Sequence, residues 1–261
     1  MKKIIGCLLL PLLALPAFGS YISMTTSLSS KYERGILKAH VEIVNKGDEA
    51  ACNAQAEFRS GGLSALADKV PQLPVGWTYK TDRELPLALK VPGTYPLTLV
   101  VHYTDANQYP FSALLIQTFV YGQEAPAPVF GRLNTATFDK EGRLTLQLKN
   151  SGTRPVKATS TLIVPAELTV DQAGRTATID PRSEQRVSFP VKNFSALAGS
   201  TYQVFAVTEF DDGGLHFTAI APGLVKITSE SKVFGLGNWV YVVILAVLAL
   251  AFIGAQFLRK K

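Results

Sequence analysis

The sequence contains two copies of one pattern, and this internal repeat constrains the fold more than any other feature. The segment 39–47 ends in Asn45-Lys46-Gly47, and the segment 144–152, which lies 105 positions later, ends in Asn150-Ser151-Gly152. Further matches follow at an offset of 106, where Gly93, Val101, Asp105, Phe111 and Ala113 meet Gly199, Val207, Asp211, Phe217 and Ala219. A matched period of this kind predicts two consecutive modules of about 100 residues each.

Within each copy, hydrophobic residues recur at every second position. They alternate with polar residues over 39–43 in the first copy and over 144–148 in the second. This alternation predicts half-buried β-strands. The Asn-x-Gly ends of both segments and Asp211-Asp212-Gly213-Gly214 predict turns between such strands. Each copy has about seven predicted strands, as in an immunoglobulin-like domain, and no amphipathic helix, so we expect two antiparallel β-sandwiches.

Several short motifs strengthen this interpretation. They are Asn150-x-Gly152, Val164-Pro165-Ala166-Glu167-Leu168, Ile179-Asp180-Pro181, Val187-Ser188-Phe189-Pro190-Val191, Gly199-Ser200-Thr201-Tyr202 and Phe210-Asp211-Asp212-Gly213-Gly214. The series resembles the bacterial and archaeal Ig-like surface domains of the CARDB-like and S-layer-associated families, over most of 130–229 and less fully over 20–123. The first copy departs most between Gly61 and Leu89. The resemblance implies a sandwich fold, an extracytoplasmic location and a spacer, scaffold or contact role, and it defines no catalytic residue.

The N-terminus has the three regions of a secretory signal peptide. Met1-Lys2-Lys3 is followed by an apolar stretch over 4–18 and then by Gly19-Ser20. This order predicts cleavage after Gly19. A retained N-terminal anchor is the alternative, although Pro11 and Pro16 interrupt an already short apolar segment.

The C-terminus predicts a transmembrane helix. Residues 239–258 are 20 residues without a charge, enough for a helix to cross the roughly 30 Å hydrocarbon core of a bilayer. Trp239 and Tyr241 suit the outer interface, and Arg259, Lys260 and Lys261 form a basic flank on the cytoplasmic side. The expected localisation is therefore the cell membrane, with a single pass, both modules outside in the periplasm or beyond the cell, and the C-terminus in the cytoplasm. Alternatively, Phe234 to Asn238, the apolar stretch and the basic end form a sorting signal that is removed by proteolysis, although Phe234 to Asn238 matches none of the well-known recognition motifs.

These boundaries divide the chain into seven parts. We expect a signal peptide (1–19), a first Ig-like sandwich (20–123), a Pro-rich linker (124–129), a second Ig-like sandwich (130–229), a juxtamembrane segment (230–238), a transmembrane helix (239–258) and a basic tail (259–261). The fold class is therefore all-β, with two tandem Ig-like β-sandwiches plus one C-terminal transmembrane helix. Alternate prolines at 126 and 128 predict a stiff, extended linker that holds the modules apart.

Charge and composition argue against several functions. The chain has 26 basic and 20 acidic residues, but five of the basic residues lie at the two ends, which leaves 21 against 20 in the body. Because the charges of the body nearly balance, it has no excess positive field that could attract the phosphates of a nucleic acid, and we expect no nucleic-acid partner. We expect no cofactor and no metal site; Asp211 and Asp212 could bind calcium, but a hairpin turn explains them better.

The same sequence offers little for catalysis. Only His40, His102 and His216 could act as a histidine base, and we expect all three on the surface. No hydrolase elbow, metalloprotease helix or phosphate-binding loop occurs. The chain is therefore expected not to be an enzyme.

The irregular segment of the first copy contains the best candidate contact residues. Trp77 and Tyr79 lie in Leu73-Pro74-Val75-Gly76-Trp77-Thr78-Tyr79-Lys80. Such aromatics bind protein partners or stack on sugars, whereas the alternative is that Trp77 closes the sandwich core. We predict a scaffold or contact protein of the cell envelope. Its expected partner is another protein that lies outside the cytoplasm or in the membrane. A carbohydrate-binding or exopolysaccharide-binding surface protein is the alternative.

Overall fold

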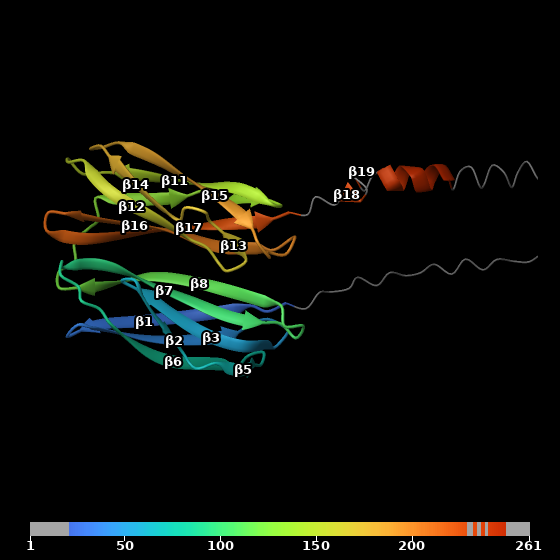
Figure 1. Cartoon of the computed structure of the whole chain (residues 1–261), viewed down its shortest axis with the longest axis horizontal. Helices are drawn as coiled ribbons and strands as arrows, with labels where there is room; N and C mark the ends of the chain where they lie inside the picture. The colour runs from blue at the N-terminus through green and yellow to red at the C-terminus, as the bar shows by residue number, and fades with distance from the viewer. Residues whose placement is uncertain (1–20, 229–231, 234–235, 238–239, 249–261) are drawn as a thin grey trace, which may run out of the picture.

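The computed structural model describes residues 21–228, 232–233, 236–237 and 240–248. Residues 24–121 form eight strands, namely β1 (Met24–Glu33), β2 (Ile36–Asn45), β3 (Ala51–Ser60), β4 (Leu63–Leu66), β5 (Val70–Leu73), β6 (Thr78–Pro86), β7 (Gly93–Thr104) and β8 (Pro110–Tyr121). Residues 129–227 form nine, namely β9 (Val129–Leu133), β10 (Ala136–Phe138), β11 (Glu141–Asn150), β12 (Val156–Ile163), β13 (Leu168–Thr169), β14 (Gly174–Ile179), β15 (Glu184–Asn193), β16 (Thr201–Asp212) and β17 (Leu215–Ile227). The strands make two β-sandwiches (Figure 1), so the predicted sandwich fold is confirmed.

Each sandwich consists of two facing sheets. In the first sandwich, the sheet β1-β2-β6 faces a sheet in which β4 and β5 pair with β3, β3 pairs with β7, and β7 pairs with β8. In the second, the sheet β13-β15-β11-β9 faces the sheet β14-β12-β16-β17. The second sandwich also contains β10, which lies parallel to the outer edge of β17, from Ala136 opposite Val225 to Phe138 opposite Ile227.

The residues that predicted strands are the residues that form the cores. Every second residue of β2 from Leu37 to Ile43, and of β11 from Leu144 to Leu148, is buried. Because side chains alternate between the two faces of a strand, this spacing places one apolar row inside each sandwich. The largest fully buried side chains are Phe58 in the first core and Phe189 in the second.

An equivalent buried asparagine stabilises the same turn in each sandwich. Asn45 and Asn150 are fully buried at the ends of β2 and β11. The amide nitrogen of Asn45 donates to the backbone oxygens of Glu49 and Leu73, and its oxygen accepts from the backbone N–H of Gly47. Asn150 repeats the arrangement with Arg154, Ile179 and Gly152. A buried amide satisfies both its donor and its acceptor here, so the Asn-x-Gly motif closes one end of each core.

The two sandwiches pack side by side, with β7 and β8 against β16 and β17 (Figure 1). Side chains on the outer faces of these sheets form a third buried cluster, which contains Val100, Leu114, Ile116, Phe205 and Val207. The expectation of an extended linker that holds the modules apart is therefore wrong. Residues 122–128 have no regular structure, and burial of apolar surface on both sandwiches holds the modules together.

The second sandwich is reversed relative to the first. β17 runs parallel to β7 at the bridge between His216 and Gly93, and hence opposite to β8, its counterpart in the first copy. The N–H of His216 donates to the backbone oxygen of Pro92 at 2.8 Å. Gly93 has a φ of +146°, and a Cβ on it would lie 1.9 Å from the backbone oxygen of His216. Only glycine allows the two backbones to approach so closely at this corner.

The structure overturns the prediction for the C-terminus. The described residues contain one helix, at 240–248, which includes Tyr241. No helix among the described residues is long and apolar enough to cross a membrane. The predicted transmembrane helix at 239–258 and the single-pass membrane localisation are therefore wrong. The predicted anchor residues Trp239, Arg259, Lys260 and Lys261 lie outside the described residues, and Tyr241 lies in the helix at 240–248.

The other predictions for the two ends of the chain concern residues that the structure largely does not describe. The signal peptide (1–19), Trp239 and residues 249–261 are not among the described residues. Of residues 234–238, at the start of the predicted sorting signal, Leu236–Gly237 is described; it forms β19, which pairs with β18 (Lys232–Val233).

Replacing Asn150 with alanine tests the role of the buried asparagine. Asn150→Ala leaves the oxygens of Arg154 and Ile179 and the N–H of Gly152 without a partner, so we expect the free energy of unfolding to fall by about 2 to 3 kcal/mol. Urea unfolding followed by circular dichroism measures the change. The exposed Asn107 provides the control, and Asn107→Ala should change the free energy of unfolding by less than about 0.5 kcal/mol. Equal losses for the two variants would contradict the assignment.

Candidate functional site

The turn that contains Trp77 holds this side chain in solvent. Its N–H donates to the oxygen of Pro74 at 3.1 Å, and the N–H of Gly76, at a φ of +77°, donates to the oxygen of Asn45 at 2.8 Å. The backbone is thus tied to the end of β2, while Trp77 is 66% exposed and Val75 is 47% exposed. Trp77 therefore does not fill the sandwich core, and the alternative that it does is wrong.

Tyr79 has a different environment from Trp77. It is half-buried near the start of β6 and packs against the first core. Its hydroxyl donates to the backbone oxygen of Asp68 at 2.6 Å, and burial raises the pKa of Tyr79. The side chain thus holds the segment between β4 and β5 in place, so of the two predicted contact residues only Trp77 is freely presented.

Two of the histidines lie on strand faces, as expected, and each has an acidic partner. His40 is 2.8 Å from Asp82, and His102 is 2.8 Å from Glu57. Glu57 also accepts two hydrogen bonds from Arg59. These hydrogen bonds, chiefly those from Arg59, outweigh burial and lower the pKa of Glu57 to about 2.

His216 is not a surface residue, and the prediction for it is wrong. Only 15% of its side chain is exposed, because the ring stacks on Tyr95 of the first sandwich with centroids 4.2 Å apart. Its Nδ1 is 2.7 Å from Asp211, and its Nε2 is 3.4 Å from Glu209. Burial alone lowers the pKa of His216, but the hydrogen bonds to the two carboxylates outweigh it and raise the pKa.

The acidic turn after β16 makes contacts within the protein. Asp211 pairs with His216, and Asp212 lies 3.5 Å from Arg154. Gly213 and Gly214 both have positive φ, as a tight hairpin requires. Among the described residues, no group of three or more His, Cys, Asp or Glu side chains could hold a metal ion.

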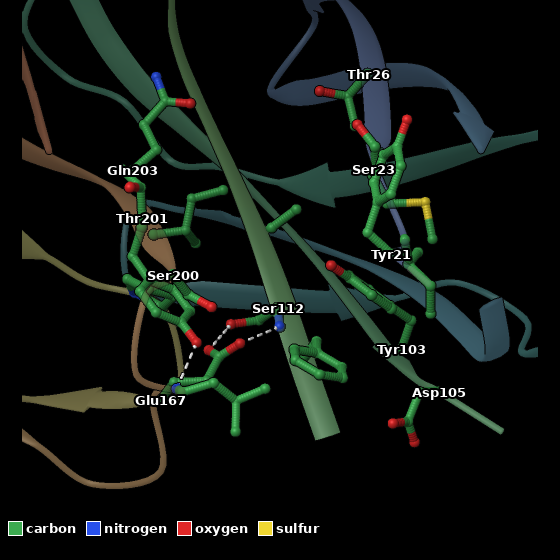
Figure 2. A pocket seen from close by; sticks show the side chains of 18 of the residues that line it. Tyr21, Ser23, Thr26, Tyr103, Asp105, Ser112, Glu167, Ser200, Thr201 and Gln203 are labelled. Carbon is green, nitrogen blue, oxygen red and sulfur yellow. Dashed lines mark hydrogen bonds between the residues drawn. The ribbon is translucent and has the colours of Figure 1, made fainter. Parts of the chain in front are cut away.

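A cleft of about 530 Å³ lies between the two sandwiches (Figure 2). Its lining comes from residues 21–24 and Thr26 at and before the start of β1, from Ser112 to Leu115 on β8, and from Pro165, Glu167, Leu197 and residues 200–203 of the second sandwich. None of these residues was predicted as a site. They come from segments far apart in the sequence, so only the packing of the two sandwiches brings them together.

Separation of β1 from β8 opens the cleft. The two strands belong to different sheets, and they meet at one end, where Gln117 donates to Ser30 and Tyr32 lies against Phe119 and Tyr121. At the other end, beside Met24 and Ala113, the cleft lies between them.

Glu167 joins the two sandwiches at the cleft. It is 1% exposed, and its carboxylate accepts from the N–H and the hydroxyl of Ser112 at 2.8 and 2.7 Å. Figure 2 shows this contact between the two sandwiches. Close by, the hydroxyl of Tyr109 donates to the backbone oxygen of Ser195. These bonds satisfy polar groups that the interface removes from water.

The cleft is aromatic and acidic. Tyr21, Tyr103, Phe111 and Tyr202 line it, and so do three carboxylates, Glu49, Asp105 and Glu167, but no lysine, arginine or histidine does. Burial raises the pKa of Tyr103, and the charge of Glu167 raises it further. Burial is also the main cause of the raised pKa of Tyr202. A surface of this kind favours a positively charged group.

Comparisons with known proteins identify no family. No family model matches the chain, and no curated protein matches it. Solved structures resemble it distantly: native α2-macroglobulin of Escherichia coli is 11% identical over 79% of this chain and 17% of its own, with a TM-score of 0.32. A non-cellulosomal cohesin from Archaeoglobus fulgidus is 11% identical over 41% of this chain and 95% of its own, with a TM-score of 0.30. Red sea bream transglutaminase is 12% identical over 78% of this chain and 31% of its own, with a TM-score of 0.28. The chain spans less than a fifth of that α2-macroglobulin.

Removing Glu167 should weaken the contact between the sandwiches. Glu167→Ala leaves the N–H of Ser112 buried without an acceptor, and we expect the free energy of unfolding to fall by about 3 kcal/mol. Denaturant unfolding, followed separately for the two sandwiches by hydrogen exchange, measures the effect. Glu184→Gln, at an exposed position on β15, is the control and should change little. An unchanged midpoint for Glu167→Ala would contradict the role.

His216 makes stability depend on pH. The folded pKa of His216 is raised above its ordinary value of 6.5, so its contribution is fully present below that pH and is lost as the pH rises through the folded pKa. We expect the free energy of unfolding of the wild type to exceed that of His216→Gln by more at about pH 5.5 than at about pH 8.5. Urea titrations of both proteins at each pH test this. A difference independent of pH would contradict it.

Proposed function

We propose that this protein is a non-enzymatic scaffold whose tandem Ig-like modules contact another protein, and that the turn containing Trp77 is a contact site. The observation on which the proposal depends is that a large aromatic side chain, 66% exposed, stands on a turn whose backbone is bonded to a strand end. Exposed tryptophans of this kind are frequent centres of binding energy at protein interfaces.

The surroundings of Trp77 support a contact role. Val75 beside it is also exposed. The turn is bonded to Asn45, the same buried residue that closes the first core. A turn whose backbone is held in this way loses little conformational freedom on binding, and more of the contact energy then appears as affinity.

The packing of the two sandwiches also suits a scaffold. The third buried cluster and the bonds of Glu167 hold them in one arrangement. A partner would therefore meet a surface of fixed shape. The proposed likeness to CARDB-like surface domains agrees with such a role, because those families act as spacers, scaffolds or contact modules.

Crosslinking at the turn tests the proposal. A photoreactive amino acid placed at Val75 of the full chain should capture a discrete protein in cells of the source organism, and the same residue at Leu66 should not capture it. Leu66 is the matched control because it is 57% exposed on the same sandwich. The captured protein is then purified and its affinity for the chain is measured directly.

Trp77→Ala should weaken that binding by about 30-fold or more, whereas Leu66→Ala should change it by less than about two-fold. Both variants should keep the thermal stability of the wild type, because both side chains lie in solvent. Equal affinities for the two variants would contradict the proposal. Retention of the chain on polysaccharide that is lost with Trp77→Ala would instead favour a carbohydrate-binding protein.

A further inference from the structure

The edge of β8 that faces the cleft lacks a neighbouring strand. Among the described strands, β8 pairs only with β7. The N–H of Ser112 points away from β7, because it donates to the carboxylate of Glu167. Backbone groups alternate along a strand, so the N–H and C=O of Leu114 point to the same side, into the cleft that Leu114 lines.

The second sandwich shows how such an edge is filled. Its counterpart of β8 is β17, and the three-residue strand β10 pairs with β17 in parallel along the corresponding outer edge. In the first sandwich, β1 stays paired with β2 along its whole length, from Met24 opposite Asn45 to Glu33 opposite Ile36. β10 covers residues 225–227 of β17, which correspond to 119–121 of β8, the end at which Tyr32 of β1 lies against Phe119 and Tyr121. At the other end, from Ser112 to Leu115, no described strand pairs with the edge of β8 that faces the cleft. Open strand edges are the sites at which extended peptides add to sheets.

The charge of the cleft selects the peptide. Glu49 and Asp105 lie in its lining beside Tyr21 and Tyr103, and no basic side chain lies there. The carboxylates of Glu49 and Asp105 each accept one backbone N–H, from Ala106 and Tyr109. A carboxylate can accept several hydrogen bonds, so both can still bind a donor from a ligand.

We propose that the cleft binds a short extended segment of a partner protein, which adds as a strand to the edge of β8 beyond Ser112 and places a lysine or arginine between the aromatic rings and the carboxylates of Glu49 and Asp105. This site is separate from the turn of Trp77. Backbone pairing supplies affinity at such a site, and the basic side chain supplies specificity.

Synthetic peptides and the full chain test the proposal. The probe is a fluorescent peptide of alternating valine and threonine with one central lysine, and its binding is measured by anisotropy. Three comparisons use the same wild-type chain: the peptide with glutamate in place of lysine, the peptide methylated at alternate backbone nitrogens, and 1,5-diaminopentane as a competitor. The lysine peptide should bind, the glutamate peptide should bind at least about ten-fold more weakly, and backbone methylation should weaken binding about five-fold.

Changes in the chain locate the site. Glu49→Gln and Asp105→Asn each keep an acceptor for the backbone N–H groups but remove a negative charge. Each should weaken the binding of the lysine peptide about three-fold. Thr26→Trp, which fills the cleft from β1, should abolish binding. Glu184→Gln on β15 is the matched control for charge, and Trp77→Ala separates this site from the proposed contact turn; neither should change the affinity.

Several outcomes would overturn the proposal. Equal affinity for the lysine and glutamate peptides would remove the charge argument. Equal affinity for the methylated and the unmethylated lysine peptide would show that the peptide does not pair with β8 as a strand. Competition by 1,5-diaminopentane as strong as that by the unlabelled lysine peptide would show that the cleft binds small cations instead of a peptide. Because the peptide comparisons leave the protein unchanged, they decide the question even if a variant fails to fold.

Discussion

The contact between the two sandwiches determines which surfaces of the molecule remain exposed. It is a buried apolar cluster in which Phe205 and Val207 of β16 pack against Val100, Leu114 and Ile116 of β7 and β8. A sandwich buries only the inner faces of its two sheets. Here one outer face of each sandwich is apolar as well, and packing the two together removes both from water. The arrangement brings the two copies side by side in opposite directions, so that segments more than 50 residues apart in the chain become neighbours across the cleft.

Polar contacts at the margins of this apolar cluster fix the register of the two sandwiches. At one end, the carboxylate of Glu167 accepts two hydrogen bonds from Ser112. At the other, His216 stacks on Tyr95, and the backbone of His216 meets that of Gly93 with no room for a side chain. Apolar packing alone tolerates sliding, whereas hydrogen bonds at both ends permit one alignment. In that alignment, residues 200–203 of the second sandwich lie beside the end of the first sandwich at which β1 and β8 are apart, and the cleft lies between them.

The sequence predicts each sandwich well because strands and turns are local patterns. Period-two alternation over 39–43 and 144–148 identifies strands, and Asn45 and Asn150 identify the turns that close them. The packing of the two modules depends on the outer faces of their sheets, and the sequence indicates it only through strands that are apolar on both faces. Residues 97–101 of β7 and 204–208 of β16 are buried without interruption, which is what a strand covered on both faces requires. A proline-rich linker suggested separation, but linker stiffness cannot outweigh a buried interface.

The candidate site was predictable only in part, for a related reason. Trp77 stood out because it lies where the first copy departs from the second, whereas its exposure depends on the bonds between its turn and Asn45. The cleft could not be found from motifs, since its residues share no spacing. Both features nevertheless follow from one comparison. The two copies share the asparagine turn and the strand order of the core, which serve folding, and they differ in the Trp77 turn and at the outer edge of β8. In a repeated unit the framework must remain the same for each copy to fold, while an edge or a turn is free to change. The surfaces on which the copies differ are therefore where binding is expected, and in this chain both belong to the first sandwich.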